Sequence, residues 1–224
     1  MNTSIAPVSR PKEQARLSYN RLSRWYDWLA GPSEQAFRRR GLTLLAPRPG
    51  EQILEIGPGT GHSLLTLAQG VGESGHVWGV DISDGMLALA RQRLERAGLN
   101  LRVTLVQGDA ARLDFLPEAS LDAIFLSFTL ELFDTPEILQ VLTECRRTLK
   151  PDGRLVVVSL ARCDPPSLAI RLYEWLHRLM PAYVDCRPIY ARLALEETGF
   201  AILVHERSSM WGLPVDILLG RKTS

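Results

Sequence analysis

The sequence has few cysteines and no long apolar run, and each shortage excludes a class of protein. Its three cysteines, Cys145, Cys163 and Cys186, are odd in number and far apart. They fit neither a zinc-ligand spacing nor a disulfide framework, so we expect a cytoplasmic setting and no metal site. No stretch of about 18 apolar residues occurs, and the N-terminus lacks the apolar core of a secretion signal. The sequence therefore predicts neither a membrane span nor export.

The charges nearly cancel. Among 224 residues, 26 are Lys or Arg and 25 are Asp or Glu, which gives a formal net charge of +1. Such a chain has no long-range field that attracts nucleic acid. Its hydrophobic content of 46% is ordinary for a globular domain of this length. We therefore expect one domain over residues 1–224 that acts on a small molecule and not on a nucleic acid.

A glycine-rich turn gives the most informative pattern. An apolar run that includes Glu55 ends in Gly-Pro-Gly-Thr-Gly at residues 57–61, and a helical pattern follows. Such a strand, loop and helix start hold nucleotide-like ligands in open α/β sheets. The dinucleotide fingerprint would have its last glycine where His62 stands, and the Glu55 carboxylate would repel a pyrophosphate but attract an ammonium group. The alternative for Glu55 is a carboxylate that caps the amides of the loop.

A second acid follows at the expected distance. Asp81 ends the next apolar run, 20 residues after Gly61. A ribose-binding acid occurs at about this separation in nucleotide-binding units. The alternative is an exposed acid at the start of the helix that begins near Ser83.

Together these segments resemble the motifs of the class I S-adenosylmethionine-dependent methyltransferases. They follow the order of the family motifs over roughly residues 50–160, and the group most resembled is that of ubiquinone/menaquinone biosynthesis. The matching segments are 55–61 (Glu-Ile-Gly-Pro-Gly-Thr-Gly), 80–83 (Val-Asp-Ile-Ser), 106–110 (Val-Gln-Gly-Asp-Ala), 121–127 (Leu-Asp-Ala-Ile-Phe-Leu-Ser) and 149–155 (Leu-Lys-Pro-Asp-Gly-Arg-Leu).

The resemblance implies a Rossmann-like α/β fold with S-adenosylmethionine as its cofactor. It implies a seven-stranded, mostly parallel sheet with helices on both faces. An N-terminal helical cap (1–46), a cofactor-binding core (47–163), and lid helices with a closing strand pair (164–224) complete the expected domain. The implied cofactor contacts are Glu55, Gly57, Gly59, Gly61, Asp81, Ile82, Asp109, Ala110, Ser127, Tyr19 and Tyr26.

Several of these assignments leave alternatives open. Asp114 could serve in place of Asp109, and Phe128, beside Ser127, is as well suited to the core as to the site. The seven-residue spacing of Tyr19 and Tyr26 puts both on one helix face. There they could meet the sulfonium by cation–π attraction or pack against the core.

The implied activity is methyl transfer to a small, apolar or quinone-like acceptor. No catalytic residue stands out, because transfer from a sulfonium needs positioning in a dry site more than charge stabilisation. Arg187 could bind an acidic acceptor, and His177 could act as a base or be surface. The alternatives are a phospholipid-amine methyltransferase with peripheral membrane contact, a non-catalytic cofactor-binding protein, and a nicotinamide-dependent oxidoreductase.

The periodicity of apolar residues predicts strands that alternate with helices. Ser33 is the expected cap of the second helix. The predicted strands are 51–56, 76–81, 101–106, 121–127, 153–160, 200–207 and 210–220. The predicted helices are 11–29, 33–46, 61–70, 83–97, 136–148, 167–180 and 189–198.

Overall fold

The computed structural model describes residues 31–163 and 187–223, without the side chains of residues 31–33. The first half contains α2 (Gly31–Leu45), β1 (Gln52–Ile56), α3 (His62–Val71), β2 (His76–Asp81), α4 (Asp84–Arg96), the 3₁₀ turn η1 (Asn100–Arg102) and β3 (Val103–Gln107). The second half contains β4 (Leu121–Ser127), the 3₁₀ turn η2 (Leu130–Leu132), α5 (Thr135–Thr148), β5 (Leu149–Leu160), α7 (Ala191–Glu197), β6 (Phe200–Met210) and β7 (Leu213–Lys222).

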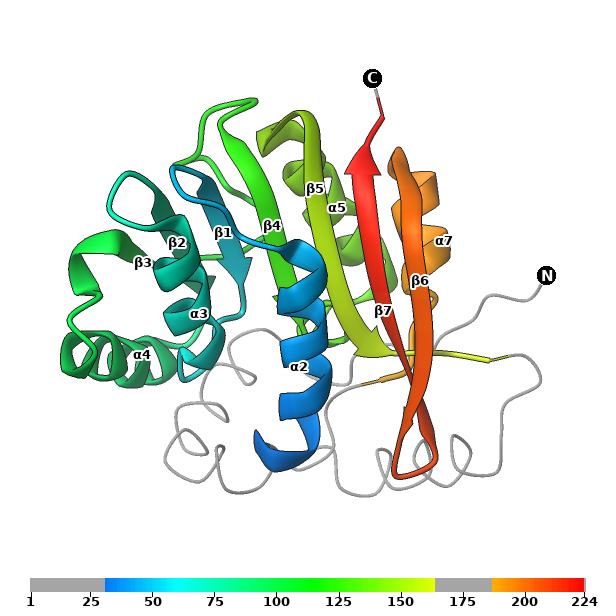
Figure 1. The fold of residues 1–224 in the computed structure, drawn as a ribbon. Helices are drawn as coiled ribbons and strands as arrows, with labels where there is room; N and C mark the ends of the chain where they lie inside the picture. The colour runs from blue at the N-terminus through cyan, green and yellow to red at the C-terminus, as the bar shows by residue number, and fades with distance from the viewer. Residues whose placement is uncertain (1–30, 164–186, 224) are drawn as a thin grey trace.

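The strands form one seven-stranded sheet in the order β3-β2-β1-β4-β5-β7-β6. Strands β1 to β5 are parallel, and β7 runs antiparallel to both of its neighbours, β5 and β6. Helices α2, α3 and α4 cover one face, and α5 and α7 cover the other (Figure 1). The predicted Rossmann-like, mostly parallel sheet is therefore confirmed. The strand order reverses between β1 and β4, and ligands bind beyond the carboxyl ends of the strands at such a point.

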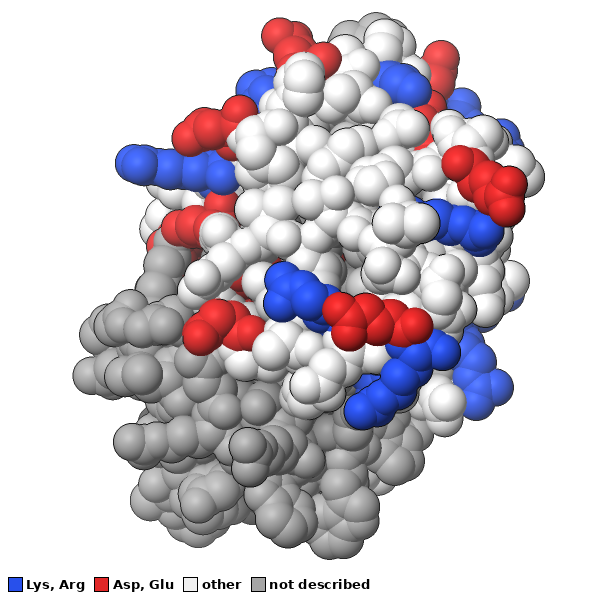
Figure 2. Space-filling view, turned by 90° about the vertical axis from the view of Figure 1, so that its left-hand side faces the viewer, with Lys and Arg blue, Asp and Glu red and all other residues white. Residues whose placement is uncertain are grey.

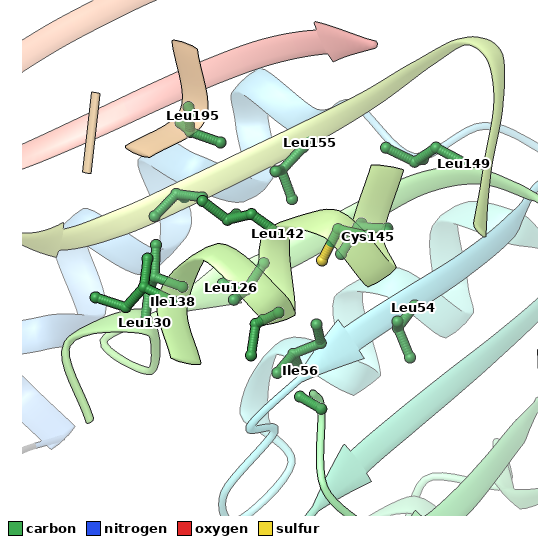
Figure 3. Close-up of a cluster of buried hydrophobic side chains, with 14 of the residues drawn as sticks. Leu54, Ile56, Leu126, Leu130, Ile138, Leu142, Cys145, Leu149, Leu155 and Leu195 are labelled. Atoms are coloured by element: carbon green, nitrogen blue, oxygen red, sulfur yellow. The ribbon is translucent and has the colours of Figure 1, made fainter. Parts of the chain in front are cut away.

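Each face of the sheet has its own apolar core. One core joins α2, α3 and α4 to the sheet through residues such as Leu45, Leu67 and Leu94. The other lies under α5 and α7, where Leu126, Leu142, Cys145 and Leu155 meet (Figure 3). The central strands are buried on both faces, which is why their sequences read as nearly continuous apolar runs.

Helix α2, the described part of the predicted N-terminal cap, packs directly onto the sheet. A Cβ atom on Gly41 would lie 2.6 Å from Cγ2 of Val158 in β5, so glycine permits the close approach. Gly31 and Pro32, predicted to precede this helix, belong to its first turn, so the prediction that Ser33 caps it is wrong. Proline is tolerated there because it gives up no helical hydrogen bond. The cap's remaining residues, with Tyr19 and Tyr26, lie outside the described residues, as do the 167–180 helix, His177 and Cys186.

Four strands differ from the prediction by two residues or more at a boundary. β6 ends at Met210 and not at residue 207, and β7 begins at Leu213 and not at residue 210, because the turn between them lies at residues 211–212. β3 begins at Val103 and not at residue 101, because residues 100–102 form a 3₁₀ turn. β5 begins at Leu149 and not at residue 153, since Leu149 already pairs with Leu121 before an irregularity in the register. Asp152 sits in that irregularity with φ +61°. The sequence Pro-Asp-Gly at residues 151–153, which favours a turn, therefore forms a distortion within a strand.

The face of the molecule shown in Figure 2 has no large patch of charge of one sign among its described residues. On the side of the molecule that carries β3 and α4, acidic and basic side chains are interspersed (Figure 2). Among the residues that the structure describes, no helix has both the length and the apolar content to cross a bilayer. The cytoplasmic setting stays a prediction.

Candidate functional site

The glycine loop lies between the ends of β1, β2 and β4. Gly57 N donates to the carbonyl of Val80 at 2.9 Å, and the pairing of Ile56 with Leu126 places Ser127 beside the loop on its other side. The predicted residues of three separate motifs are therefore brought together by the parallel register.

The three glycines of this loop have two different roles. A Cβ on Gly57 would lie 2.4 Å from Cγ2 of Thr129, and one on Gly61 would lie 2.9 Å from the Cβ of Ala90. Tight contacts between protein segments thus explain those two positions. A Cβ on Gly59 would meet no described atom within 4 Å, although φ is +52°. Gly59 is therefore the position at which a ligand can approach the backbone.

Glu55 is a buried carboxylate next to this opening. Its side chain is 1% exposed, and its Oε2 atom has no hydrogen-bond partner among the described residues. The pKa of Glu55 is raised to about 8, chiefly by burial, although a hydrogen bond with Ser63 and the charge of Arg38 oppose the shift and the charge of Asp81 adds to it. A buried carboxylate with an unused oxygen is suited to a cationic ligand group.

Asp81, and not Glu55, accepts a hydrogen bond from an amide of the loop. Its Oδ2 accepts from Gly59 N at 3.2 Å, and its Oδ1 accepts from Ser83 N at 2.9 Å. Burial raises the pKa of Asp81 to about 6, although these backbone hydrogen bonds oppose the shift. A carboxylate has about four lone-pair sites, so beside its backbone hydrogen bonds Asp81 can accept a further bond, such as one from a sugar hydroxyl.

The expected adenine-side residues lie beside Asp81. Gly108 N donates to the Asp81 carbonyl at 3.0 Å, which brings Asp109 and the buried Ala110 next to Ile82 and β2. The Oδ1 atom of Asp109 accepts from Ala111 N at 3.0 Å, so a local turn fixes its carboxylate. The alternative acid, Asp114, is exposed.

The residue that follows β4 has a left-handed backbone conformation. Phe128, directly after Ser127, has φ +53° and is 5% exposed. Its ring meets that of Phe37 edge to face, with centroids 6.3 Å apart, and its amide donates to Val158. Non-glycine residues in this conformation cluster at functional sites. The core interpretation of Phe128 is thus supported by its contacts, while its backbone turns the chain at the edge of the site.

Sequence reasoning missed the residues that hold the site in place. Thr129 fills the space that Gly57 leaves and donates to the Ser127 carbonyl at 3.1 Å. Arg93 of α4 donates to the carbonyl of Thr60 in the loop. Neither belongs to a glycine or acid motif, and only its place in the fold identifies it.

Arg187 is engaged within the protein. It is 4% exposed, it donates to the Phe133 carbonyl, and it lies 4.0 Å from Asp134. Burial lowers its pKa, while Asp134 and the fully buried Glu131 act in the opposite direction. The role proposed for Arg187 in binding an acidic acceptor has no support in this geometry.

Comparison with known proteins agrees with this arrangement. Residues 53–153 match a family model described as a methyltransferase domain. A ubiquinone/menaquinone biosynthesis C-methyltransferase, UbiE, of Ectopseudomonas mendocina is 33% identical over 172 residues, which cover 75% of this chain and 66% of that protein. A demethylmenaquinone methyltransferase of Listeria welshimeri is 30% identical over 147 residues, or 66% of this chain and 61% of that protein. The chain thus spans about three fifths of the length of the Listeria relatives.

Among solved structures, the [4+2]-cyclase SpnF has a TM-score of 0.76 at 20% identity and covers 98% of both chains. With the fold and the glycine loop, these matches establish the class. The chain belongs to the class I S-adenosylmethionine-dependent methyltransferases, and S-adenosylmethionine is the cofactor of that class. A cyclase with the same fold shows that the fold alone does not decide the reaction.

The described residues fit this cofactor. The unused Oε2 atom of Glu55 suits an ammonium group, and the Asp81 carboxylate suits a sugar diol. The open space at Gly59 leaves room for the part of the cofactor that joins its ammonium group to its sugar. The buried Glu55 carboxylate is equally unsuited to the pyrophosphate of NAD.

Proposed function

We propose that this protein transfers a methyl group from S-adenosylmethionine to a small, apolar, quinone-like acceptor. The observation that carries the proposal is the pairing of a buried, incompletely bonded carboxylate at Glu55 with an open backbone position at Gly59. The relatives named for ubiquinone/menaquinone and demethylmenaquinone support the choice of acceptor class.

The cofactor supplies an electrophilic methyl group on a sulfonium that leaves as a neutral thioether. In the proposal, Glu55 receives the ammonium of the methionine tail and Asp81 receives the ribose hydroxyls. Asp109 and Ala110, with Ile82, border the adenine. This leaves the carboxyl end of β4 for the acceptor.

Ser127 and Phe128 are the proposed wall on the acceptor side. Phe128 is anchored by its amide bond to Val158 and by its contact with Phe37, so its backbone holds a fixed position. A fixed, apolar wall excludes water and aligns the acceptor with the methyl group, and such positioning provides most of the acceleration that this displacement needs. The contributions of Tyr19, Tyr26 and the 164–186 segment to a cap or lid remain part of this proposal, from the sequence resemblance alone.

Calorimetric titration with S-adenosylmethionine tests the cofactor site. Asp81→Ala should weaken binding at least about tenfold, the loss of one or two hydrogen bonds to a charged group. The matched control is Asp122→Ala, because Asp122 lies at the other end of β4 and accepts from Gln52 N and Lys150. The control should leave affinity unchanged. Equal affinity in the Asp81 variant and the parent would contradict the assignment.

Methyl transfer is tested separately from binding. The parent protein with radiolabelled cofactor should methylate a demethylated naphthoquinol and leave phosphatidylethanolamine unlabelled. Labelling of the phospholipid alone would replace the quinone proposal by the phospholipid-amine alternative. Binding without transfer to either would favour a non-catalytic protein, and a thermal shift with NADH but not with S-adenosylhomocysteine would favour an oxidoreductase.

A further inference from the structure

The β6–β7 hairpin ends in an exposed tryptophan. Met210 pairs with Leu213, which leaves Trp211 and Gly212 as the two residues of the turn. Their φ values are +52° and +82°, and positive φ at both positions is the signature of a type I′ turn. Trp211 is nevertheless 78% exposed. Asn-Gly and Gly-Gly are the favoured sequences for this turn, so Trp211 makes the turn less stable than asparagine or glycine would.

The tip of this hairpin lies at the same edge of the sheet as the candidate site. Val215 pairs with Leu160, the last residue of β5, and the Pro214 carbonyl accepts from Ala161 N at 2.8 Å. The residues of the turn therefore extend beyond the carboxyl end of β5, while Ser127 of β4 pairs with Val158 just inside it. In Figure 1 the hairpin projects past the end of the β5 arrow.

The tip carries no charge. Residues 208–215 read Ser-Ser-Met-Trp-Gly-Leu-Pro-Val. The flanking charges are Arg207 and Asp216, which neutralise each other through two hydrogen bonds of 2.7 and 2.9 Å. An uncharged tip with one large amphipathic ring is thus bordered by a compensated ion pair.

The size and chemistry of the tip indicate which kind of partner can bind it. A fully buried tryptophan removes about 150–250 Å² from water, whereas a stable dimer buries about 800 Å² per partner. A second copy of this chain would therefore gain too little from this contact. Tryptophan prefers the headgroup level of a bilayer, where its ring is buried and its N–H stays hydrated.

We propose that the Trp211 hairpin tip makes a weak, reversible contact with the surface of a lipid bilayer and turns the carboxyl edge of the sheet toward it. This deepens the proposed function, on which it rests for its purpose, because a quinone-like acceptor dissolves in the bilayer. A single inserted side chain gives marginal binding. The contact orients the protein and does not anchor it.

Trp211→Asn is the decisive variant because asparagine suits a left-handed turn position before Gly212. The variant should fold with an equal or higher thermal midpoint, so loss of binding cannot be attributed to unfolding. The matched control is Leu101→Asn. Leu101 is 90% exposed and directly precedes β3, which is the outermost strand on the side of the sheet opposite to β6.

The experiment measures sedimentation of the full chain with phosphatidylcholine vesicles, without cofactor or acceptor. The parent and the Leu101 variant should bind alike, and Trp211→Asn should bind about tenfold more weakly. Brominated lipids should quench part of the parent's fluorescence, and this part should be absent from the Trp211 variant. Addition of an anionic lipid should change the comparison little, because the tip is uncharged.

Three results would overturn the inference: equal vesicle binding by the parent and the Trp211 variant, an equal loss in the Leu101 variant, or a dimer without lipid that only Trp211→Asn abolishes. These arms contain no acceptor, so failure of the quinone proposal leaves them unaffected. If both proposals hold, Trp211→Asn should raise KM for a vesicle-embedded quinol while kcat for the same quinol in detergent stays unchanged.

Discussion

Replacement of Glu55 by glutamine should make both stability and cofactor binding less dependent on pH. The folded-state pKa of Glu55 is about 8, above its ordinary value of 4.5. The folded protein therefore holds a proton at Glu55 that the unfolded chain releases between these pH values. The contribution of this proton to the free energy of unfolding is fully present below about pH 4.5 and falls by about 1.4 kcal/mol per pH unit as pH rises toward 8. The total is on the order of 5 kcal/mol.

The same proton is coupled to cofactor binding. At pH 7 a group with a pKa of about 8 is roughly nine-tenths protonated. An ammonium placed at Oε2 favours the carboxylate, so binding should release close to one proton from Glu55. Affinity should then rise about tenfold per pH unit up to about pH 7.5, above which the amino group of the ligand begins to lose its own proton. Glutamine has no proton to release, and its affinity at pH 7 should be lower and nearly independent of pH.

Calorimetry at pH 7 in phosphate and in Tris measures the proton release, because the two buffers differ in ionisation enthalpy. Urea unfolding of the parent and Glu55→Gln at pH 5, 7 and 8 measures the stability difference. Asp81, with a pKa of about 6, also titrates in this window. Since it is present in both proteins, the difference between them isolates Glu55. Identical proton release, together with parallel stability curves, would refute the reasoning.

Further substitutions test the loop and the C-terminal strand pair. Gly57→Ala should lower stability by about 2–4 kcal/mol in denaturant unfolding, because the new Cβ would overlap Thr129 at 2.4 Å and φ is +66°. Gly59→Ala should cost only about 1 kcal/mol of stability but weaken cofactor binding at least about tenfold, and similar losses in both assays would contradict the open position. Asp216→Asn should cost about 2 kcal/mol at pH 7, since it breaks the bidentate contact with Arg207. The pKa of Asp216 lies below its ordinary value of 3.8, because its hydrogen bonds lower the pKa by more than burial raises it. The stability that ionised Asp216 contributes should therefore disappear as pH falls below about 3.8, and the stability of the variant should depend less steeply on pH in acid.

The fold could be predicted largely because its signals are local. Apolar runs such as 53–56 and 121–127 appear as β1 and β4. The helix predicted from residue 83 begins at Asp84, directly after Ser83, whose Oγ accepts from Met86 N at 3.1 Å. The largest boundary error, at the start of β5, comes from a turn signal at Asp152 that the pairing of Leu149 with Leu121 absorbs into the strand. Tertiary pairing overrides local propensity there.

The candidate site could be predicted in its residue types but not in its division of roles. Sequence spacing identified Glu55 and Asp81, yet it assigned the capping alternative to Glu55, and the structure gives that role to Asp81. The structural role of Gly61 was also hidden, because Ala90 lies on another helix. Cofactor contacts at the predicted positions stay predictions until they are measured.

The order of residues alone determined the alternation of strands and helices, the acid-flanked glycine turn and hence the class, because each depends on groups that are neighbours along the chain. Only the tertiary structure decided which carboxylate is left with an unused oxygen, which glycine faces open space, and which edge the Trp211 hairpin overhangs. Burial and exposure depend on segments far apart in the sequence, such as Gly57 and Thr129, and these meet only when the sheet assembles.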